Sequence, residues 1–229
     1  MIIALNHKCH FDKEEFISYL NEFSTINTSN KLILCPTYLN IPLVNNQNIL
    51  LGSQNVSFAD NGSYTGEISA KQLKSYGVKY SIVGHSERRK NQKETNEEIA
   101  LKVKELLQND ITPILCVGET LEERENNLQK EIIQKELFNI LDIKDIDKII
   151  IAYEPIWSIG TGLLPTNNEI DEVITYIKSL LPNNSVLYGG SVTDENVDNL
   201  NRISSIDGYL IGGLSLKIDR LKKLLEKCN

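Results

Sequence analysis

Short apolar runs recur along the chain, and longer stretches of mixed apolar and polar residues separate them. Several runs carry β-branched and other apolar residues at consecutive positions, which is typical of strands buried on both faces, as in a parallel sheet. We predict eight strands, at Ile2–Leu5, Leu32–Cys35, Ile49–Gln54, Tyr80–Val83, Ile114–Val117, Ile149–Tyr153, Val186–Tyr188 and Tyr209–Ile211.

The stretches between these runs show the period of amphipathic helices. Apolar residues stand at 99, 103, 106 and 107, at 170, 173, 174 and 177, and at 218, 221 and 225, so each helix presents one apolar face. Two helix starts carry a matching signal: Thr95 precedes Glu97 and Glu98, and Thr166 stands three residues before Glu169, which is the spacing of a capping box.

Eight strand–helix units indicate either an open doubly wound sheet or a closed barrel. No low-complexity linker interrupts the series, which favours a closed (β/α)8 barrel of the α/β class, formed as one domain by residues 1–229. The helical pattern is weak between Leu39 and Asn48. The Asn-rich stretch Asn21–Asn30 is predicted to be a surface loop after the first helix, with a linker as the alternative.

Composition and charge narrow the possible partners. The chain has 229 residues and a formal net charge of −7, which disfavours nucleic acid and anionic membranes as partners. An anionic substrate would have to be held by local charge. No apolar run approaches the ~20 residues of a membrane helix, and the first ten residues lack the apolar core of a signal peptide. The four cysteines (Cys9, Cys35, Cys116 and Cys228) form no C-x-x-C pair, so we expect reduced thiols and a cytoplasmic location.

Candidate chemistry follows from where the strands end, because the site of such a barrel lies at the carboxyl ends of its strands. Asn6 and Lys8 follow the first strand, His85 and Glu87 follow the fourth, and Glu154 follows the sixth. Taken singly, each has an ordinary structural explanation. Together they bring a carboxylate base, an imidazole and an ammonium group to the same rim.

Two glycine-rich turns predict an anion site beside these groups. Ser191 follows Gly189-Gly190 and precedes a helix expected to begin near Asp194, while Gly212-Gly213 precedes a helix expected near Lys217. Glycine lets backbone N–H groups approach an anion, and helix N-termini carry partial positive charge. The alternative is that both are ordinary turns. Asp194 and Glu195 are expected to be solvated acids at the start of the helix.

Several of these segments resemble those of the triosephosphate isomerase family, in the same order and over the whole chain. Ala152–Gly162 resembles the family's base-and-lid segment, Val83–Arg89 its electrophile segment and Asn6-x-Lys8 its first-strand contact. Tyr188–Val192 and Gly212-Gly213 resemble its phosphate-binding turns, and Asn61–Glu67 resembles its dimer loop.

The resemblance implies a TIM barrel that interconverts dihydroxyacetone phosphate and D-glyceraldehyde 3-phosphate through an enediol(ate), in glycolysis and gluconeogenesis. It implies that Glu154 is the base, His85 a neutral electrophile, and Lys8 with Asn6 the groups that stabilise the oxyanion. This division of labour between the glutamate and the histidine is established for the family. Independently of the family, a helix that starts after His85 would disfavour an imidazolium there.

The resemblance also implies binding of the substrate phosphate by Gly160, Ser191, Gly212 and Gly213. Trp157 and Ile159 would give the lid an apolar face, although a Trp is as often a core residue. Glu87 would orient the site, or else form an exposed helical ion pair. No residue set has metal-ligand spacing and no dinucleotide or P-loop motif is present, so we expect no metal and no cofactor.

A homodimer is expected through Asn61–Glu67, with Thr65 entering a pocket near the partner's site and Arg88 pairing with Glu67 of the partner subunit. The chain departs from the family at four places: His7 and Cys9 flank Lys8, Ser158 follows Trp157, and Pro165 stands at the far end of the lid. Two alternatives stay open. One is another phosphosugar-barrel enzyme, and the other is a non-catalytic phosphosugar-binding barrel.

Overall fold

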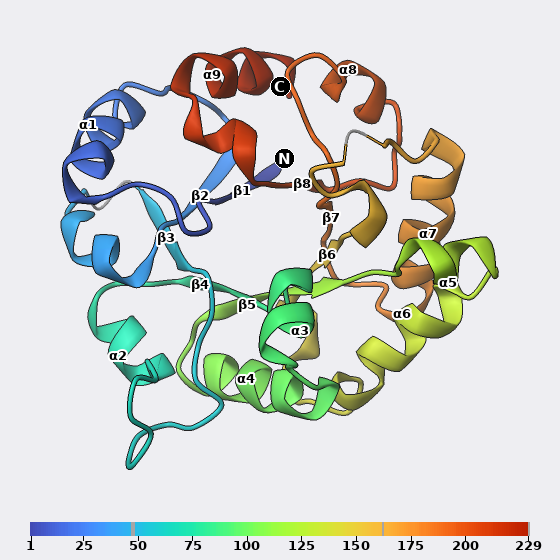
Figure 1. Cartoon of the computed structure of the whole chain (residues 1–229), viewed down its shortest axis with the longest axis horizontal. Coiled ribbons are helices and arrows are strands. Elements are labelled where there is room, and N and C mark those ends of the chain that lie inside the picture. The colour runs from blue at the N-terminus through green and yellow to red at the C-terminus, as the bar shows by residue number, and fades with distance from the viewer. Residues whose placement is uncertain (47–48, 162, 229) are drawn as a thin grey trace.

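The computed structural model describes residues 1–46, 49–161 and 163–228, and it is a closed parallel barrel in which the strands follow one another in chain order from β1 to β8. Strand β8 closes the barrel by pairing with β1. Figure 1 shows the strands in the centre and the helices in a ring around them. The predicted (β/α)8 barrel is therefore confirmed.

The strands lie where the apolar runs predicted them. They are β1 (Ile2–Asn6), β2 (Lys31–Cys35), β3 (Leu50–Ser53), β4 (Tyr80–Val83), β5 (Thr112–Val117), β6 (Ile150–Tyr153), β7 (Val186–Tyr188) and β8 (Gly208–Ile211). The largest boundary differences are at β3, which is shorter at both ends than predicted, and at β5, which begins two residues earlier. Backbone hydrogen bonds between neighbouring strands set these ends, and they cannot be predicted from the apolar run of a single strand.

The helices on the outside of the barrel are mostly capped by their own sequences. They are α1 (Lys13–Phe23), α2 (Ala70–Ser75), α3 (Ser86–Gln92), α4 (Asn96–Gln108), α5 (Leu121–Glu125), α6 (Gln129–Leu137), α7 (Asn167–Leu180), α8 (Val197–Leu200) and α9 (Ile218–Lys227). Capping boxes form at Thr95 with Glu98 and at Thr166 with Glu169, as predicted. Short 3-10 turns are η1 (Tyr38–Leu43), η2 (Phe138–Ile140), η3 (Ile146–Lys148), η4 (Ile156–Ser158) and η5 (Gly213–Leu216).

Three local predictions are wrong or only partly right. The weak helix after Leu39 is the 3-10 turn η1, which contains Pro42; a proline inside an α-helix removes a hydrogen bond and clashes with the preceding turn. Asn48 lies outside the described residues. Helix α1 continues to Phe23, so the loop begins after Asn21. The helix expected near Asp194 begins only at Val197 and has four residues.

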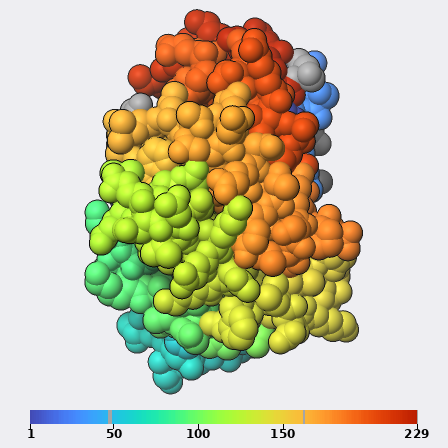
Figure 2. Space-filling model, turned by 90° about the vertical axis from the view of Figure 1, so that its right-hand side faces the viewer, coloured from blue at the N-terminus to red at the C-terminus, as the bar shows by residue number. Residues whose placement is uncertain are grey.

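The core forms two layers because successive strand residues point to opposite faces. On β1, Ala4 faces the barrel interior with Ile33, Ile82 and Leu210. Ile3 and Leu5 of the same strand point outward and pack against the helices. Figure 2 shows how the outer elements on the α5–α7 side cover the barrel without a break. Within the described residues, the helices are too short or too polar for any of them to cross a membrane.

Candidate active site

The residues predicted for the site meet around one cavity at the carboxyl ends of the strands. The cavity has a volume of about 350 Å³. Its lining includes all eight predicted residues: Asn6, Lys8, His85, Glu154, Gly160, Ser191, Gly212 and Gly213. Barrel closure therefore brings together groups that are as much as 207 positions apart along the chain (213 − 6).

Glu154 and His85 face each other on the floor of this cavity. Glu154 Oε1 lies 3.2 Å from His85 Nε2, and its other oxygen accepts a long hydrogen bond of 3.4 Å from Ser86 N. Both side chains are buried. His85 is the N-cap of α3, and its Nδ1 accepts a hydrogen bond of 3.2 Å from Glu87 N. With Nδ1 as an acceptor, Nε2 is the ring nitrogen left to donate, and it points at the carboxylate.

Lys8 reaches the same cavity from a strained loop that follows β1. Its backbone has φ of +49°, an uncommon value for a residue with a side chain. Asn6 Oδ1 accepts from Lys8 N at 3.0 Å, and Gln54 Nε2 donates to Lys8 O at 2.8 Å. These contacts hold the loop in its strained form, so Asn6 and Gln54 set the direction in which the lysine side chain leaves the backbone.

Glu87 links the lysine to the histidine helix. Its Oε1 lies 2.6 Å from Lys8 Nζ, and its Oε2 lies 3.8 Å from His85 Nδ1. Partial burial pushes the Glu87 pKa upward, but the hydrogen bond from Lys8 and the nearby positive charge hold the pKa below its ordinary value. Glu87 thus pairs with Lys8, a cavity residue 79 positions away in the chain. The alternative prediction, an exposed ion pair within its own helix, is not what the structure shows.

Two glycines make room for Glu154. A Cβ on Gly118 would stand 1.8 Å from Glu154 O, and a Cβ on Gly189 would stand 2.9 Å from Glu154 Cγ. Both clashes are closer than real Cβ contacts allow. The backbone is fixed from both sides as well, because Glu154 N donates to Val117 O at 2.7 Å and Gly189 N donates to Tyr153 O at 2.8 Å. The position of the carboxylate therefore depends on β5 and β7.

The two glycine-rich turns face the cavity with free donors. Within the described residues, the N–H groups of Ser191, Gly212 and Gly213 donate to no protein acceptor. Lys8 Cε lies 3.4 Å from the point where a Cβ of Gly212 would stand, so the lysine crosses the edge of this turn. The donors and the ammonium group form an electropositive concavity suited to a small anion. The four-residue α8 adds little here, contrary to the predicted helix N-terminus.

Comparison with known proteins agrees with this geometry. The family model described as triosephosphate isomerase matches residues 1–228. Among curated relatives named triosephosphate isomerase, one from Wolbachia sp. subsp. Brugia malayi is 43% identical over 231 residues, covering 99% of this chain and 97% of the relative. One from Mycoplasmopsis pulmonis is 38% identical over 239 residues, covering 98% and 96%, and one from Bacteroides fragilis is 37% identical over 247 residues, covering 100% and 98%.

The chain belongs to the triosephosphate isomerase family. It is therefore an isomerase, and its closed barrel carries the fold of that family.

The segment that resembles the lid of triosephosphate isomerases leaves β6 directly after Glu154. Trp157 is half-buried, and its Nε1 donates to Glu119 Oε1 at 3.1 Å, which also accepts from Tyr153 OH at 3.0 Å. Burial raises the pKa of the Glu119 carboxyl, while these two donors act in the opposite direction. The next residue, Ser158, accepts a hydrogen bond of 2.7 Å at its backbone oxygen from Ser191 Oγ. Gly162, which is part of the resemblance, lies outside the described residues.

Sequence reasoning missed several residues that the cavity or its supports use. Gly118 and Glu119 follow β5, so the strand-end rule applied to every strand would have found them, whereas Gln54 follows β3 in the structure but lay inside the predicted strand. Arg220 lies beyond the reach of that rule because it is in a helix, yet it lines the cavity. The prediction that Asp194 and Glu195 are solvated acids is wrong for Asp194, whose side chain is 13% exposed and pairs with Arg220, and right for Glu195, which is 82% exposed although it also lies near Arg220.

The two residues that depart from the family around Lys8 differ in their surroundings. Cys9 is exposed. His7 is buried in an aromatic cluster with Phe11, Phe16 and Tyr19, and the His7 and Tyr19 rings lie 4.7 Å apart at 89°. Within the described residues, neither ring nitrogen of His7 has a partner. Burial lowers the pKa of His7 to about 3, so this histidine serves as an apolar filler and is uncharged at neutral pH.

Proposed function

We propose that this isomerase interconverts dihydroxyacetone phosphate and D-glyceraldehyde 3-phosphate through an enediolate. The observation that supports it most is the single cavity in which Glu154 and His85 lie 3.2 Å apart beside Lys8 and two turns with free N–H donors. A carboxylate, an imidazole, an ammonium group and an anion cradle are the groups that a proton transfer next to the carbonyl of a phosphosugar requires.

In the proposed reaction, Glu154 removes a proton from the carbon beside the carbonyl and returns it to the former carbonyl carbon. Negative charge develops meanwhile on the substrate oxygens, and the Nε2–H of His85 with the Lys8 ammonium stabilises it. A substrate oxygen that replaces Glu154 as the acceptor from Nε2 leaves the carboxylate facing the carbon. Asn6 acts on Lys8 through the hydrogen bond to its backbone N–H.

The phosphate is proposed to bind at the N–H groups of Ser191, Gly212 and Gly213, with Gly160 added when the lid closes. The hydrogen bonds of Trp157 with Glu119 and of Ser158 with Ser191 hold two adjacent residues near the start of the Ile156–Thr161 segment. Closure would exclude water from the enediolate and prevent loss of phosphate. Deletion of Ile156–Thr161 should then raise the fraction of methylglyoxal formed, and an unchanged fraction would contradict the lid role.

We also propose a homodimer formed through Asn61–Glu67. Every residue of this loop is exposed, and Figure 1 shows the segment between β3 and α2 projecting from the rim. A second cavity of about 350 Å³ adjoins the site, with Cys9 and Tyr38 in its lining and Lys8, His85 and Glu87 also in contact with it. A partner's Thr65 would enter there. In the structure Arg88 already binds Glu94 through its Nε, so pairing with Glu67 of the partner subunit would be additional.

The proposed setting is the cytoplasm, in glycolysis and gluconeogenesis, with residues 1–229 as one domain. The four free cysteines, three of them buried, support a reducing compartment. Sedimentation of the purified protein tests the dimer, since a fully active monomer would contradict an obligate one.

The decisive experiment is a coupled isomerase assay on the wild type and on Glu154→Asp. Shortening the side chain by one methylene withdraws the carboxylate by about 1 Å and should lower kcat on the order of 10²- to 10³-fold. A wild type without isomerase activity would favour the non-catalytic phosphosugar-binding barrel. Activity on another phosphosugar, untouched by Glu154→Asp, would favour a different barrel enzyme.

A further inference from the structure

The two turns proposed to bind phosphate are poorly connected by backbone. Strands β7 and β8 pair only at Leu187↔Gly208 and Tyr188↔Tyr209. The ladder therefore ends before Gly190-Ser191 on one strand and before Gly212-Gly213 on the other. An anion held by N–H groups from both turns needs a fixed distance between them, and the sheet does not supply it.

Arg220 connects the segments that follow these turns. It lies in the first turn of α9, a few residues after Gly213, and it lines the cavity. Its Nε donates to Asp194 Oδ1 at 2.7 Å and its Nη2 donates to the same oxygen. Nη2 also lies 3.1 Å from Glu195 Oε1. The planar guanidinium suits such a multiple contact better than an ammonium would.

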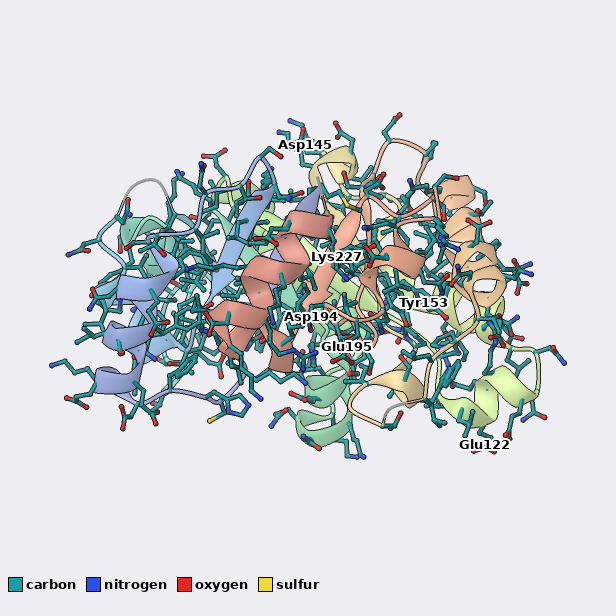
Figure 3. All side chains as sticks on the ribbon, turned by 90° about the horizontal axis from the view of Figure 1, so that it is seen from above. Glu122, Asp145, Tyr153, Asp194, Glu195 and Lys227 are labelled. Carbon is teal, nitrogen blue, oxygen red and sulfur yellow. The ribbon has the colours of Figure 1, made fainter. Side chains whose placement is uncertain are left out.

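Helix α9 holds the same segment at a second point. Lys227 Nζ donates to Asp194 O at 2.7 Å and to Asp198 Oδ2 at 2.7 Å. Arg220 and Lys227 are seven residues apart, so they lie on one face of the helix. Figure 3 shows Asp194 and Glu195 beside α9, with Lys227 farther along it.

The hold on Asp194 is transmitted to Ser191 by the turn between them. Asn196 Nδ2 donates to Ser191 O at 2.9 Å, and Asn196 Oδ1 accepts from Thr193 N at 2.8 Å. Thr193 Oγ1 accepts in turn from the backbone N–H groups of Glu195 and Asn196. Residues 191–196 therefore form one hydrogen-bonded unit, and fixing Asp194 fixes the backbone at Ser191.

We propose that Arg220 is a positioning residue for the substrate phosphate: through Asp194 it sets the turn after β7 at a fixed distance from the turn after β8. The inference rests on the proposed function, and it deepens the assignment of the phosphate site. Two carboxylates surround the guanidinium, so its contribution is geometric and its positive charge is already compensated.

Removal of the carboxylate distinguishes this role from simple attraction of an anion. If Arg220 acted as a free cation, Asp194→Ala would expose its charge and tighten anion binding. If Arg220 acts through Asp194, Asp194→Ala and Arg220→Met must both weaken binding. We expect each to raise KM and the Ki of inorganic phosphate roughly two- to fivefold, the range of a partly exposed ion pair, while kcat stays near wild type.

The double variant and matched controls complete the test. Arg220→Met combined with Asp194→Ala should be no weaker than either single variant, because the same contact is lost once. Lys222→Met on the same helix and Asp219→Ala beside Arg220 remove equal charges without touching the contact, and they should leave the Ki of phosphate near wild type. Arg220→Lys should recover part of the loss.

A Ki of phosphate in Asp194→Ala that equals or falls below the wild-type value would overturn the proposal, provided thermal unfolding shows the variant is folded. Binding of inorganic phosphate is measured by calorimetry as well as by inhibition. The result therefore stands apart from the proposed function, which fails only if the wild type has no isomerase activity.

Discussion

The two sides of the cavity are built by different means. On the side formed by β1, β4 and β6, side chains carry the chemistry, and Glu154, His85 and Lys8 are each held by hydrogen bonds or an ion pair. On the side formed by β7 and β8, the donors that face the cavity are backbone N–H groups. There the support is ionic and partly exposed, since the Arg220 side chain is 35% accessible.

The comparison indicates that the chemical side is stabilised by burial and close fit, and the phosphate side by surface contacts. Tight packing transmits small displacements, because a well-packed interior has no free space to absorb them. Substitutions on the chemical side should therefore change kcat and resist salt. Substitutions on the phosphate side should change KM and depend on ionic strength.

The largest effect is expected from Gly118→Ala, which attacks the fit around Glu154. The new methyl group would stand 1.8 Å from Glu154 O and 2.5 Å from Glu154 C, so the backbone that carries the base must move. A shift of about 1 Å costs on the order of 10²-fold in kcat, and overpacking lowers the free energy of unfolding by about 1–3 kcal/mol. Steady-state kinetics and urea denaturation measure the two effects.

The same variant contains its own control. The turns after β7 and β8 are separate from Gly118, so the Ki of inorganic phosphate should stay near the wild-type value while kcat falls. If kcat were unchanged, or if KM and Ki rose together with no change in kcat, the division between the two sides would be wrong.

The chemical side could be predicted from the sequence because its residues obey one local rule. A polar residue directly after a buried parallel strand must lie at the carboxyl-end rim, and this placed Asn6, Lys8, His85 and Glu154 correctly. The strand runs themselves were visible because residues such as those of β4 and β7 are buried on both faces. Closure of the barrel then brought the four side chains to the same mouth.

The supports of the phosphate side could not be predicted in this way. Arg220 and Asp194 are separated by 26 residues and meet only when β8 closes the barrel, so neither residue signals the contact in its own neighbourhood. Thr193 and Asn196 also look like helix-start residues. Their side chains instead close a turn, which delays α8 to Val197. The local sequence is compatible with a helix that starts near Asp194 and with a turn that delays it to Val197. In the structure the turn forms, and it is the form in which Asp194 contacts α9.

His7, which precedes Lys8 on the chemical side, should make the stability of the protein depend on pH. Burial lowers the pKa of His7 to about 3 in the folded chain, below the 6.5 of an unfolded histidine. Between these two values His7 is protonated in the unfolded chain and neutral in the folded chain. The free energy of unfolding is therefore unaffected by protonation of His7 above pH 6.5 and decreases as pH falls from 6.5 toward 3. The cost is about 1.4 kcal/mol per pH unit, or about 2 kcal/mol at pH 5.

Urea denaturation between pH 7.5 and 5 measures this dependence. His7→Phe keeps an aromatic ring in the cluster and should lose the added slope, so that it gains stability on the wild type as pH falls. His10→Gln removes an exposed imidazole from the same loop. Its charge is the smaller of the two causes that lower the His7 pKa, after burial, so this variant should keep most of the wild-type slope. Equal slopes for the wild type and His7→Phe would mean that His7 becomes protonated without unfolding.

The smallest effect is expected from Glu87→Gln. This variant removes the one contact of the chemical side discussed above that, like those of the phosphate side, is a partly exposed ion pair. The Lys8–Glu87 pair is a close one, but the Glu87 side chain is 51% exposed, and exposed pairs contribute little. We expect kcat/KM to fall by at most about fivefold, with a smaller difference at high salt. Because the Glu87 pKa is lowered, the pair persists above that pKa and is lost in the wild type as pH falls through it. The variant and the wild type should therefore converge at low pH.

Glu122→Gln removes an exposed acid from α5 and should leave kcat/KM unchanged. A loss as large as that of Gly118→Ala would instead show that Glu87 holds Lys8 as firmly as the buried contacts hold Glu154.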